Sequence, residues 1–292
     1  MKRFFYAICL IFATPACGQD NLRPSLETTY NAWREAMIRK DSGTWQRVTS
    51  EHRRIEVRNR IVSEKKAYPA AVFDLPAPPP AIQGLQYLQA KQNGPTAKAS
   101  YFGKIDFGIG GEPTDNLLVL SFTRGEVSWL YDRADFVNLS ALPAVRKELA
   151  AGNLKYLQDA PEAQPTGKLP VPPISVNPAK LVAKVYVFCP GREVQVQINK
   201  ISRHRFANAK EAEVVIGGAV DGLNEVQYSI KKLEGGSGKE VMTVRVYLMA
   251  SAPWIKPIKA FEYQIAAGEK PNAVGSGNFF VDGTVIAKLA GK

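Results

Sequence analysis

The sequence predicts two folded domains, an α+β domain followed by a domain built almost wholly of β-strands. Apolar residues recur at helical spacing from Leu26 onward, and the pattern changes to strand-like runs after Asn93. A proline-rich stretch then precedes seven short strand-like runs. We therefore assign the α+β domain to residues 24–157, a semi-rigid linker to 158–178 and the β domain to 179–292.

In the first domain, Leu26, Tyr30, Trp33 and Met37 are spaced by four, three and four residues, which predicts one helix with an apolar face. The other expected elements follow in chain order. They are a second helix over 45–66, a short helical piece over 82–88, strands over 97–107, 116–123 and 126–138, and a helix over 142–149.

The second domain should form a β-sandwich, because short alternating runs separated by Gly, Pro and Asn turns are typical of that architecture. Val194, Val196 and Ile198 alternate with polar residues, so that strand should have one buried and one wet face. His204 is expected in a solvated loop, and Cys189 in the core. The expected strands are 181–188, 193–201, 212–216, 225–231, 240–249, 258–265 and 278–287.

The N-terminus has the pattern of a bacterial secretion signal, here residues 1–17. Lys2 and Arg3 precede the apolar run Phe4–Ala13, which is too short to span a bilayer. The segment from Thr14 to Gly18 resembles a bacterial lipobox, which implies acylation of Cys17; ordinary cleavage near Ala16 is the alternative. Either way the sequence predicts export, to the periplasm, outer membrane or cell surface.

The formal net charge of +11 falls to +9 once Lys2 and Arg3 are removed. A basic exported protein is suited to anionic surfaces, and its compartment argues against nucleic acid as a partner. Arg53, Arg54 and two further arginines, Arg58 and Arg60, are closely spaced on an expected helix. They are either an anion-binding face or a solvated charged side of the helix.

The phrase Tyr30-Asn31-Ala32-Trp33-Arg34-Glu35-Ala36-Met37, followed by Lys40-Asp41 and Trp45, resembles the NTF2-like superfamily. That resemblance implies an amphipathic helix ahead of a curved antiparallel sheet that encloses a cone-shaped cavity. The residues expected to line such a cavity are Trp33, Tyr101, Trp129, Tyr131, Asp132 and Asp135.

The segment Asp221-Gly222-Leu223-Asn224-Glu225-Val226 resembles the turn and strand start of bacterial immunoglobulin-like modules. The Cys-Trp-Cys spacing of antibody domains is missing from the sequence, so the resemblance concerns the topology of the sandwich.

No strong catalytic signature accompanies these features. Asp106-Phe107-Gly108 lacks the other kinase motifs, and His52 and His204 have no second ligand at metal spacing. We expect no metal or cofactor, and an exported envelope module that binds a protein or glycan, with pilus-associated or adhesin-like roles among those that fit. The alternative is an isomerase or dehydratase for a small apolar substrate, with Asp132 or Asp135 as acid or base.

Overall fold

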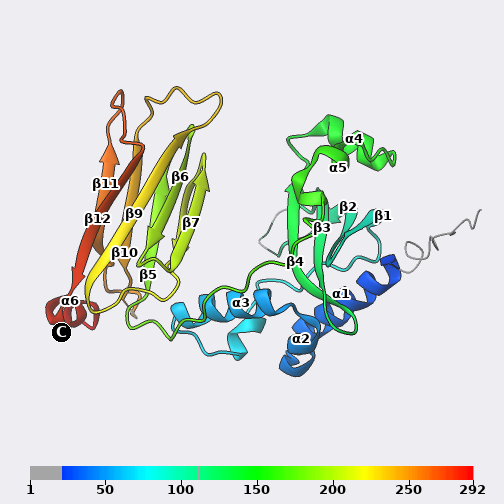
Figure 1. Ribbon diagram of the computed structural model, residues 1–292, viewed down its shortest axis with the longest axis horizontal. Helices are drawn as coiled ribbons and strands as arrows, with labels where there is room; N and C mark the ends of the chain where they lie inside the picture. Colours follow the sequence, from blue (N-terminus) through cyan, green and yellow to red (C-terminus); the bar gives the residue numbers. More distant parts are fainter. Residues whose placement is uncertain (1–21, 109, 111, 251, 292) are drawn as a thin grey trace, which may run out of the picture. The chain divides into compact units, whose positions relative to one another are not determined.

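The computed structural model describes residues 22–108, 110, 112–250 and 252–291, and divides them into two compact units. The first unit comprises the described residues up to Arg39, together with 43–50 and 77–169; the second comprises 40–42, 51–76 and the described residues from Pro170 onward. The expected α+β class and the predominance of antiparallel strands are confirmed, with three four-stranded sheets among the described residues (Figure 1).

The sheet of the first unit is an antiparallel meander in the order β1-β2-β3-β4. Its strands are β1 (Gln86–Asn93), β2 (Thr96–Ile105), β3 (Thr114–Arg124) and β4 (Trp129–Asn138). Helix α1 (Leu22–Arg39) covers one face, where Leu26 and Tyr30 pack against Leu118, Leu120 and Phe122. The short helix α2 (Ser42–Val48) follows α1.

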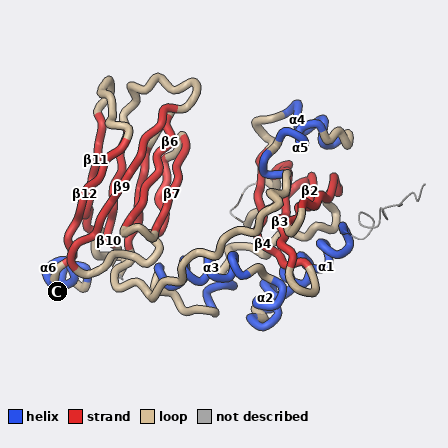
Figure 2. Tube along the Cα trace, viewed as in Figure 1, coloured by secondary structure: helices blue, strands red, loops and turns tan. Residues whose placement is uncertain are grey.

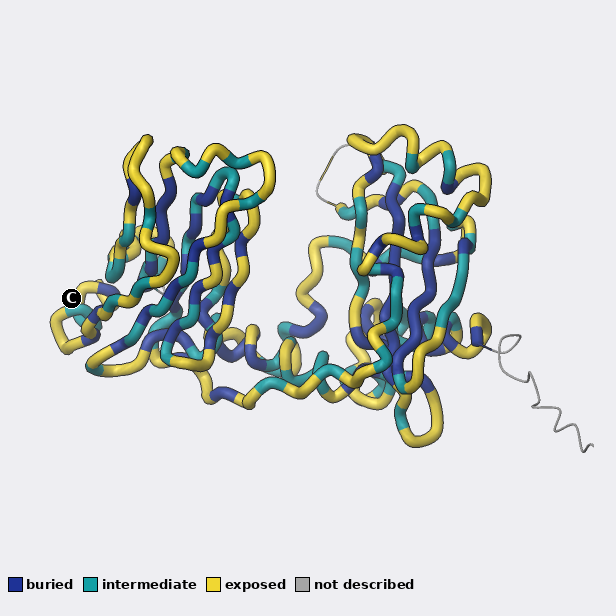
Figure 3. Tube along the Cα trace, turned by 45° about the horizontal axis from the view of Figure 1, so that its top comes forward, coloured by how far each residue is buried: buried dark blue, intermediate teal, exposed yellow. Residues whose placement is uncertain are grey.

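The opposite face of this sheet is covered by α4 (Pro143–Ala150), α5 (Lys155–Asp159) and the 3₁₀ turn η2 (Pro161–Ala163). Leu149 and Leu157 pack there against Leu117 and Val119 of β3. Because both faces are covered, the apolar run from Leu117 to Leu120 is buried on either side. Figure 3 shows buried stretches of chain in dark blue in both units.

Two expectations for this part of the chain differ from the structure. Residues 82–88 were expected to be helical, but β1 begins at Gln86, and a bulge at Leu88 brings that side chain to the face covered by α4 and α5. Part of the expected linker, 158–178, is also structured, since Ala160 and Ala163 are buried and residues up to Leu169 group with the first unit.

The second unit, whose strands are drawn in red in Figure 2, contains two four-stranded antiparallel sheets. Their strand orders are β11-β10-β5-β8 and β12-β9-β6-β7. Inward residues of both sheets, among them Val187, Val194 and Val244, form one core, so the sheets pack face to face. The strands are β5 (Ala183–Phe188), β6 (Arg192–Ile198), β7 (Ser202–Ala207), β8 (Lys210–Val214), β9 (Gly222–Lys232), β10 (Met242–Leu248), β11 (Ile258–Ile265) and β12 (Val274–Val281).

Strand β7 lies where the sequence predicted a loop, and the expectation that His204 is solvated was therefore wrong. A tight turn reverses the chain at Asn199 and Lys200, both with positive φ, and β7 then pairs with β6. His204 points inward and is 7 % exposed. At the other end of the domain, the strand expected over 278–287 ends at Val281, because Asp282 caps helix α6 (Gly283–Leu289).

Helix α3 (Glu51–Ser63) and the short 3₁₀ helix η1 (Ala70–Phe73) group with the second unit, whereas the sequence pattern placed residues 45–66 in the first. Asn59 explains this placement. Its side-chain amide donates to the carbonyl of Ile174 at 2.8 Å and accepts from the amide of Val176 at 3.1 Å. Ser63 Oγ accepts from the amide of Gly217 at 2.8 Å, so the helix is hydrogen-bonded to the extended chain and to the β8–β9 connection.

None of the described helices is long and apolar enough to cross a membrane. The expected signal peptide and Cys17 lie outside the described residues.

Candidate functional site

The aromatic residues expected to line a cavity are packed against one another. Trp33 and Tyr131 have ring centroids 4.0 Å apart, and Tyr30 lies 5.7 Å from each of them. Tyr101 and Trp129 are 1 % and 2 % exposed within the same cluster. These rings therefore form the core between α1 and the sheet.

Asp132 and Asp135, the two candidate acid–base residues, have different direct partners, although both carboxylates act electrostatically on Lys98. Asp132 sits at the bulge in β4, where its Oδ1 accepts a hydrogen bond of 2.5 Å from the hydroxyl of Ser50. Asp135 pairs in register with Val119, whose side chain packs under α4 and α5, so it lies on the face of the sheet opposite α1.

Asp135 belongs to a polar group on that face. Its Oδ2 is 3.8 Å from Nζ of Lys98, which is buried on β2 and donates to the carbonyl of Glu162 at 2.5 Å. Burial lowers the pKa of Lys98. The buried hydroxyls of Ser100 and Ser121, neighbours of Lys98 along and across the strands, make no protein hydrogen bond. Such groups cost stability unless water or another polar group meets them.

The four arginines of α3 do not form a free basic face. Arg53 pairs with Glu56 at 2.7 Å, and Arg60 lies 3.8 Å from Glu64. Arg58 donates to the carbonyl of Val176 at 2.9 Å, and Nε of Arg54 is buried. Arg53 is offset by an acid of the same helix, Arg60 by one just after its end, and Arg58 helps hold α3 in its unit.

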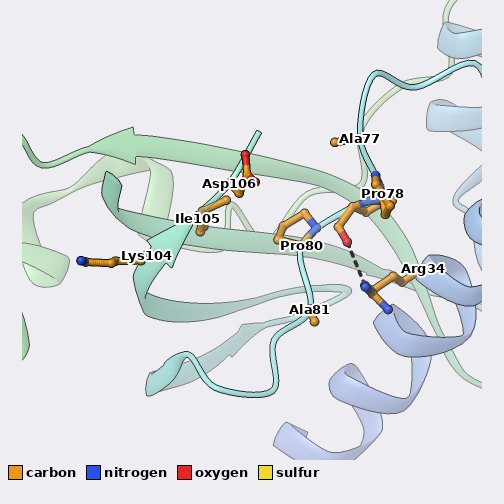
Figure 4. Close-up of a pocket in the computed structure, with 9 residues that line it drawn as sticks. Arg34, Ala77, Pro78, Pro80, Ala81, Lys104, Ile105 and Asp106 are labelled. Atoms are coloured by element: carbon orange, nitrogen blue, oxygen red, sulfur yellow. Dashed lines mark hydrogen bonds between the residues drawn. The ribbon is translucent and has the colours of Figure 1, made fainter. Parts of the chain in front are cut away.

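A shallow pocket of about 280 Å³ lies in the first unit beside the proline run 78–80 (Figure 4). Nε of Arg34 donates to the carbonyl of Pro79 at 2.8 Å, and Oδ1 of Asp106 accepts from the amide of Gly108 at the same distance. Lys104 extends away from the prolines (Figure 4). The charged groups nearest the pocket are thus occupied in holding loops.

A second depression, of about 260 Å³, lies on the outer face of the sheet β11-β10-β5-β8. Tyr186 and Tyr247 stand on neighbouring strands, and Lys184 is directly opposite Tyr247. The residues between these three along the strands point into the core, so Lys184, Tyr186 and Tyr247 point outward. Each of the three side chains is half-buried. Its lining is Lys184, Tyr186, Ala212, Tyr247, Met249 and Pro257.

Trp254 lies in the β10–β11 connection, three residues before Pro257, and is 82 % exposed. An indole this exposed gains nothing from the core, and large exposed aromatics are enriched at contact surfaces. These residues were not predicted as a site from the sequence. Their signal was present in the aromatics at the wet positions of alternating strands.

A third constellation has the residue types of a hydrolase triad. Nε2 of His204 is 2.7 Å from Oγ of Ser202, and Nδ1 is 2.6 Å from Oε2 of Glu213. Yet Ser202 is fully buried, and its Oγ also accepts from the amide of Ile216 at 2.7 Å. A nucleophile must reach a substrate, so this geometry is structural: it links β7 of one sheet to β8 of the other.

Cys189 is a buried free thiol, as expected, and burial raises its pKa. Within the described ranges no three His, Cys, Asp or Glu side chains gather as a metal site. Comparison of the chain with family models, curated proteins and solved structures returned no match.

Proposed function

We propose that the chain is a non-catalytic binding or assembly module of the cell envelope, and that its sandwich contacts a glycan or a protein through the depression at Tyr186 and Tyr247. Export rests on the signal-like N-terminus. The NTF2-like character of the first unit is supported by α1, which precedes the sheet and packs across it. The immunoglobulin-like character of the second is supported by two antiparallel sheets around one core.

The observation that carries the binding proposal is the aromatic depression with Trp254 in the adjoining connection. The ring faces of Tyr and Trp offer flat apolar area for the C–H face of a sugar ring or for an apolar side chain, and their polar ends remain hydrated. Lys184 also lines the depression, whose lining is apolar, as contact with the C–H face of a sugar ring or with an apolar side chain requires. A shallow, open surface is typical of binding to a chain molecule.

Binding to purified envelope polysaccharide, measured by isothermal titration calorimetry, tests the proposal. Tyr247→Ala and Trp254→Ala should each weaken binding about tenfold, because aromatic side chains are the usual energetic centres of such contacts. Phe136→Ala is the control, since Phe136 is 39 % exposed on the first unit and should not affect binding. If polysaccharide fails, the same variants are tested for capture of proteins from envelope extract. Affinity unchanged by both variants would contradict the proposed surface.

The alternative, an NTF2-like isomerase or dehydratase, gains less support from the described residues. Asp132 is hydrogen-bonded to Ser50 and Asp135 is paired with Lys98, and the rings that would line its cavity are packed against each other.

A further inference from the structure

Strand β12 is the least protected sheet edge in the described parts of the chain. The sheets have six edge strands, and the other five each carry charged side chains, which disfavour pairing with a further strand. Those charges are Lys91 on β1, Asp132, Arg133 and Asp135 on β4, Arg203 and Arg205 on β7, Lys210, Glu211 and Glu213 on β8, and Lys259 and Glu262 on β11.

From Val274 to Val281, β12 contains no charged residue and no proline. All eight residues pair with β9 in an unbroken register, so the strand has no bulge to bend its free side away. Val274 and Phe280 are 70 % and 62 % exposed on the outer face, and Phe280 lies directly opposite Leu223, itself 62 % exposed. Within its own sheet the outer side of β12 has no partner strand and adjoins an apolar surface, while β11 of the other sheet packs against the inner face, where the ring of Phe261 lies at Gly277.

We propose that β12 pairs antiparallel with β12 of a second copy of this chain, about a two-fold axis at Gly277. The two four-stranded sheets then join into one continuous sheet. This inference concerns a surface on the other sheet of the sandwich from the proposed ligand depression, and stands independently of it.

The side chains of β12 complement themselves in this register. Antiparallel pairing centred on Gly277 sets Val274 opposite Phe280 of the second copy, and Ser276 opposite its Asn278. On this outer face apolar pairs with apolar and polar with polar.

The residues that flank β12 carry charges of both signs, Glu269 and Lys270 before the strand and Asp282 after it, so no block of like charge opposes an antiparallel pair. A single strand pair buries less than a standard interface, so we expect a reversible dimer with a dissociation constant of order micromolar.

The test is the mass of the purified chain by light scattering across a hundredfold range of concentration. We expect a monomer that becomes a dimer as concentration rises. Ser276→Lys places two ammonium groups beside the two-fold axis and should weaken the dimer at least tenfold. Ala207→Lys, on the exposed end of β7 at the opposite edge of the same sheet, is the matched control and should leave the dimer unchanged.

Circular dichroism shows whether the Ser276→Lys variant is folded. A cross-link tests the register independently of that variant. Chains carrying Ser276→Cys and chains carrying Asn278→Cys are mixed and oxidised, and the bridged peptide is identified by mass. A disulfide between positions 276 and 278 is the expected result. A monomer at all concentrations, a dimer insensitive to Ser276→Lys, or a mixture that forms no such bridge would each overturn the proposal.

Discussion

The two edges of the sheet β12-β9-β6-β7 are built in opposite ways. Strand β7 alternates buried Ser202, His204 and Phe206 with outward arginines, and Arg205 pairs with Glu193 at 2.6 Å. Strand β12 carries no charge and keeps glycines on its inner face. The difference shows that a sandwich can close one edge with a buried polar link and charged side chains while leaving the other open for pairing.

The largest expected effect comes from cutting the link at β7. Ser202→Ala removes the acceptor for the Ile216 amide and the hydroxyl beside His204, leaving buried groups unpaired. We expect a loss of about 3 kcal/mol in the free energy of unfolding, measured in urea. Ser276→Ala, the same change on exposed β12, should stay within about 0.5 kcal/mol. Equal losses at the two positions would remove the contrast between the edges.

A smaller effect should follow from filling the inner face of β12. A Cβ on Gly277 would lie 2.4 Å from the ring of Phe261, so Gly277→Ala must displace that ring. We expect a destabilisation of about 1–3 kcal/mol in thermal or urea unfolding. Gly283→Ala is the control, because a Cβ there meets nothing within 4 Å at the start of α6. Stability unchanged by Gly277→Ala would show that the inner face of this edge is loosely packed.

The smallest expected effect is a pH dependence of stability that arises at β7, where His204 is buried, and not at β12, which carries no titratable side chain. Burial lowers the pKa of His204 below the ordinary value of a histidine, about 6.5, although the hydrogen bond to Glu213 acts in the opposite direction. The unfolded chain then binds a proton more readily than the folded one, so stability should fall as pH drops below about 6.5, by at most about 1.4 kcal/mol per pH unit.

His204→Gln should flatten this acid slope, whatever its effect at neutral pH. Unfolding of the second unit followed between pH 7.5 and 5 measures both slopes. A slope that persists in the variant would assign the pH dependence to other groups.

The sequence predicted the elements whose apolar pattern is strong. β3 was found because Leu117, Leu118, Val119 and Leu120 form a run that only a doubly covered strand buries. β6 was found because its valines alternate with glutamines. In both cases packing and local pattern agree.

Elements whose turns or partners lie outside local pattern were missed. β7 follows a turn made by Asn199 and Lys200, a pair without glycine, and its arginines suggested a loop. The spacing of Ile82, Leu85 and Leu88 fitted a helix, yet a bulge in β1 accounts for the last of these. The residues predicted to line a cavity instead fill the core, and the sequence could not show this because only tertiary packing brings Trp33 against Tyr131.

The hydrogen bonds of Asn59 to Ile174 and Val176 also affect the order in which the second unit folds. The hydrogen bond from Asn59 to Ile174 joins residues 115 positions apart, so α3 leaves the ribosome long before its partner exists. At about 5–20 residues per second the helix waits for several seconds or more. A fragment that starts at Ala179 lacks helix α3, and its Gly217 amide lacks the hydrogen-bond acceptor that Ser63 supplies. The second unit is therefore completed only when residues 51–76, made early, meet the residues from Pro170 onward, made late.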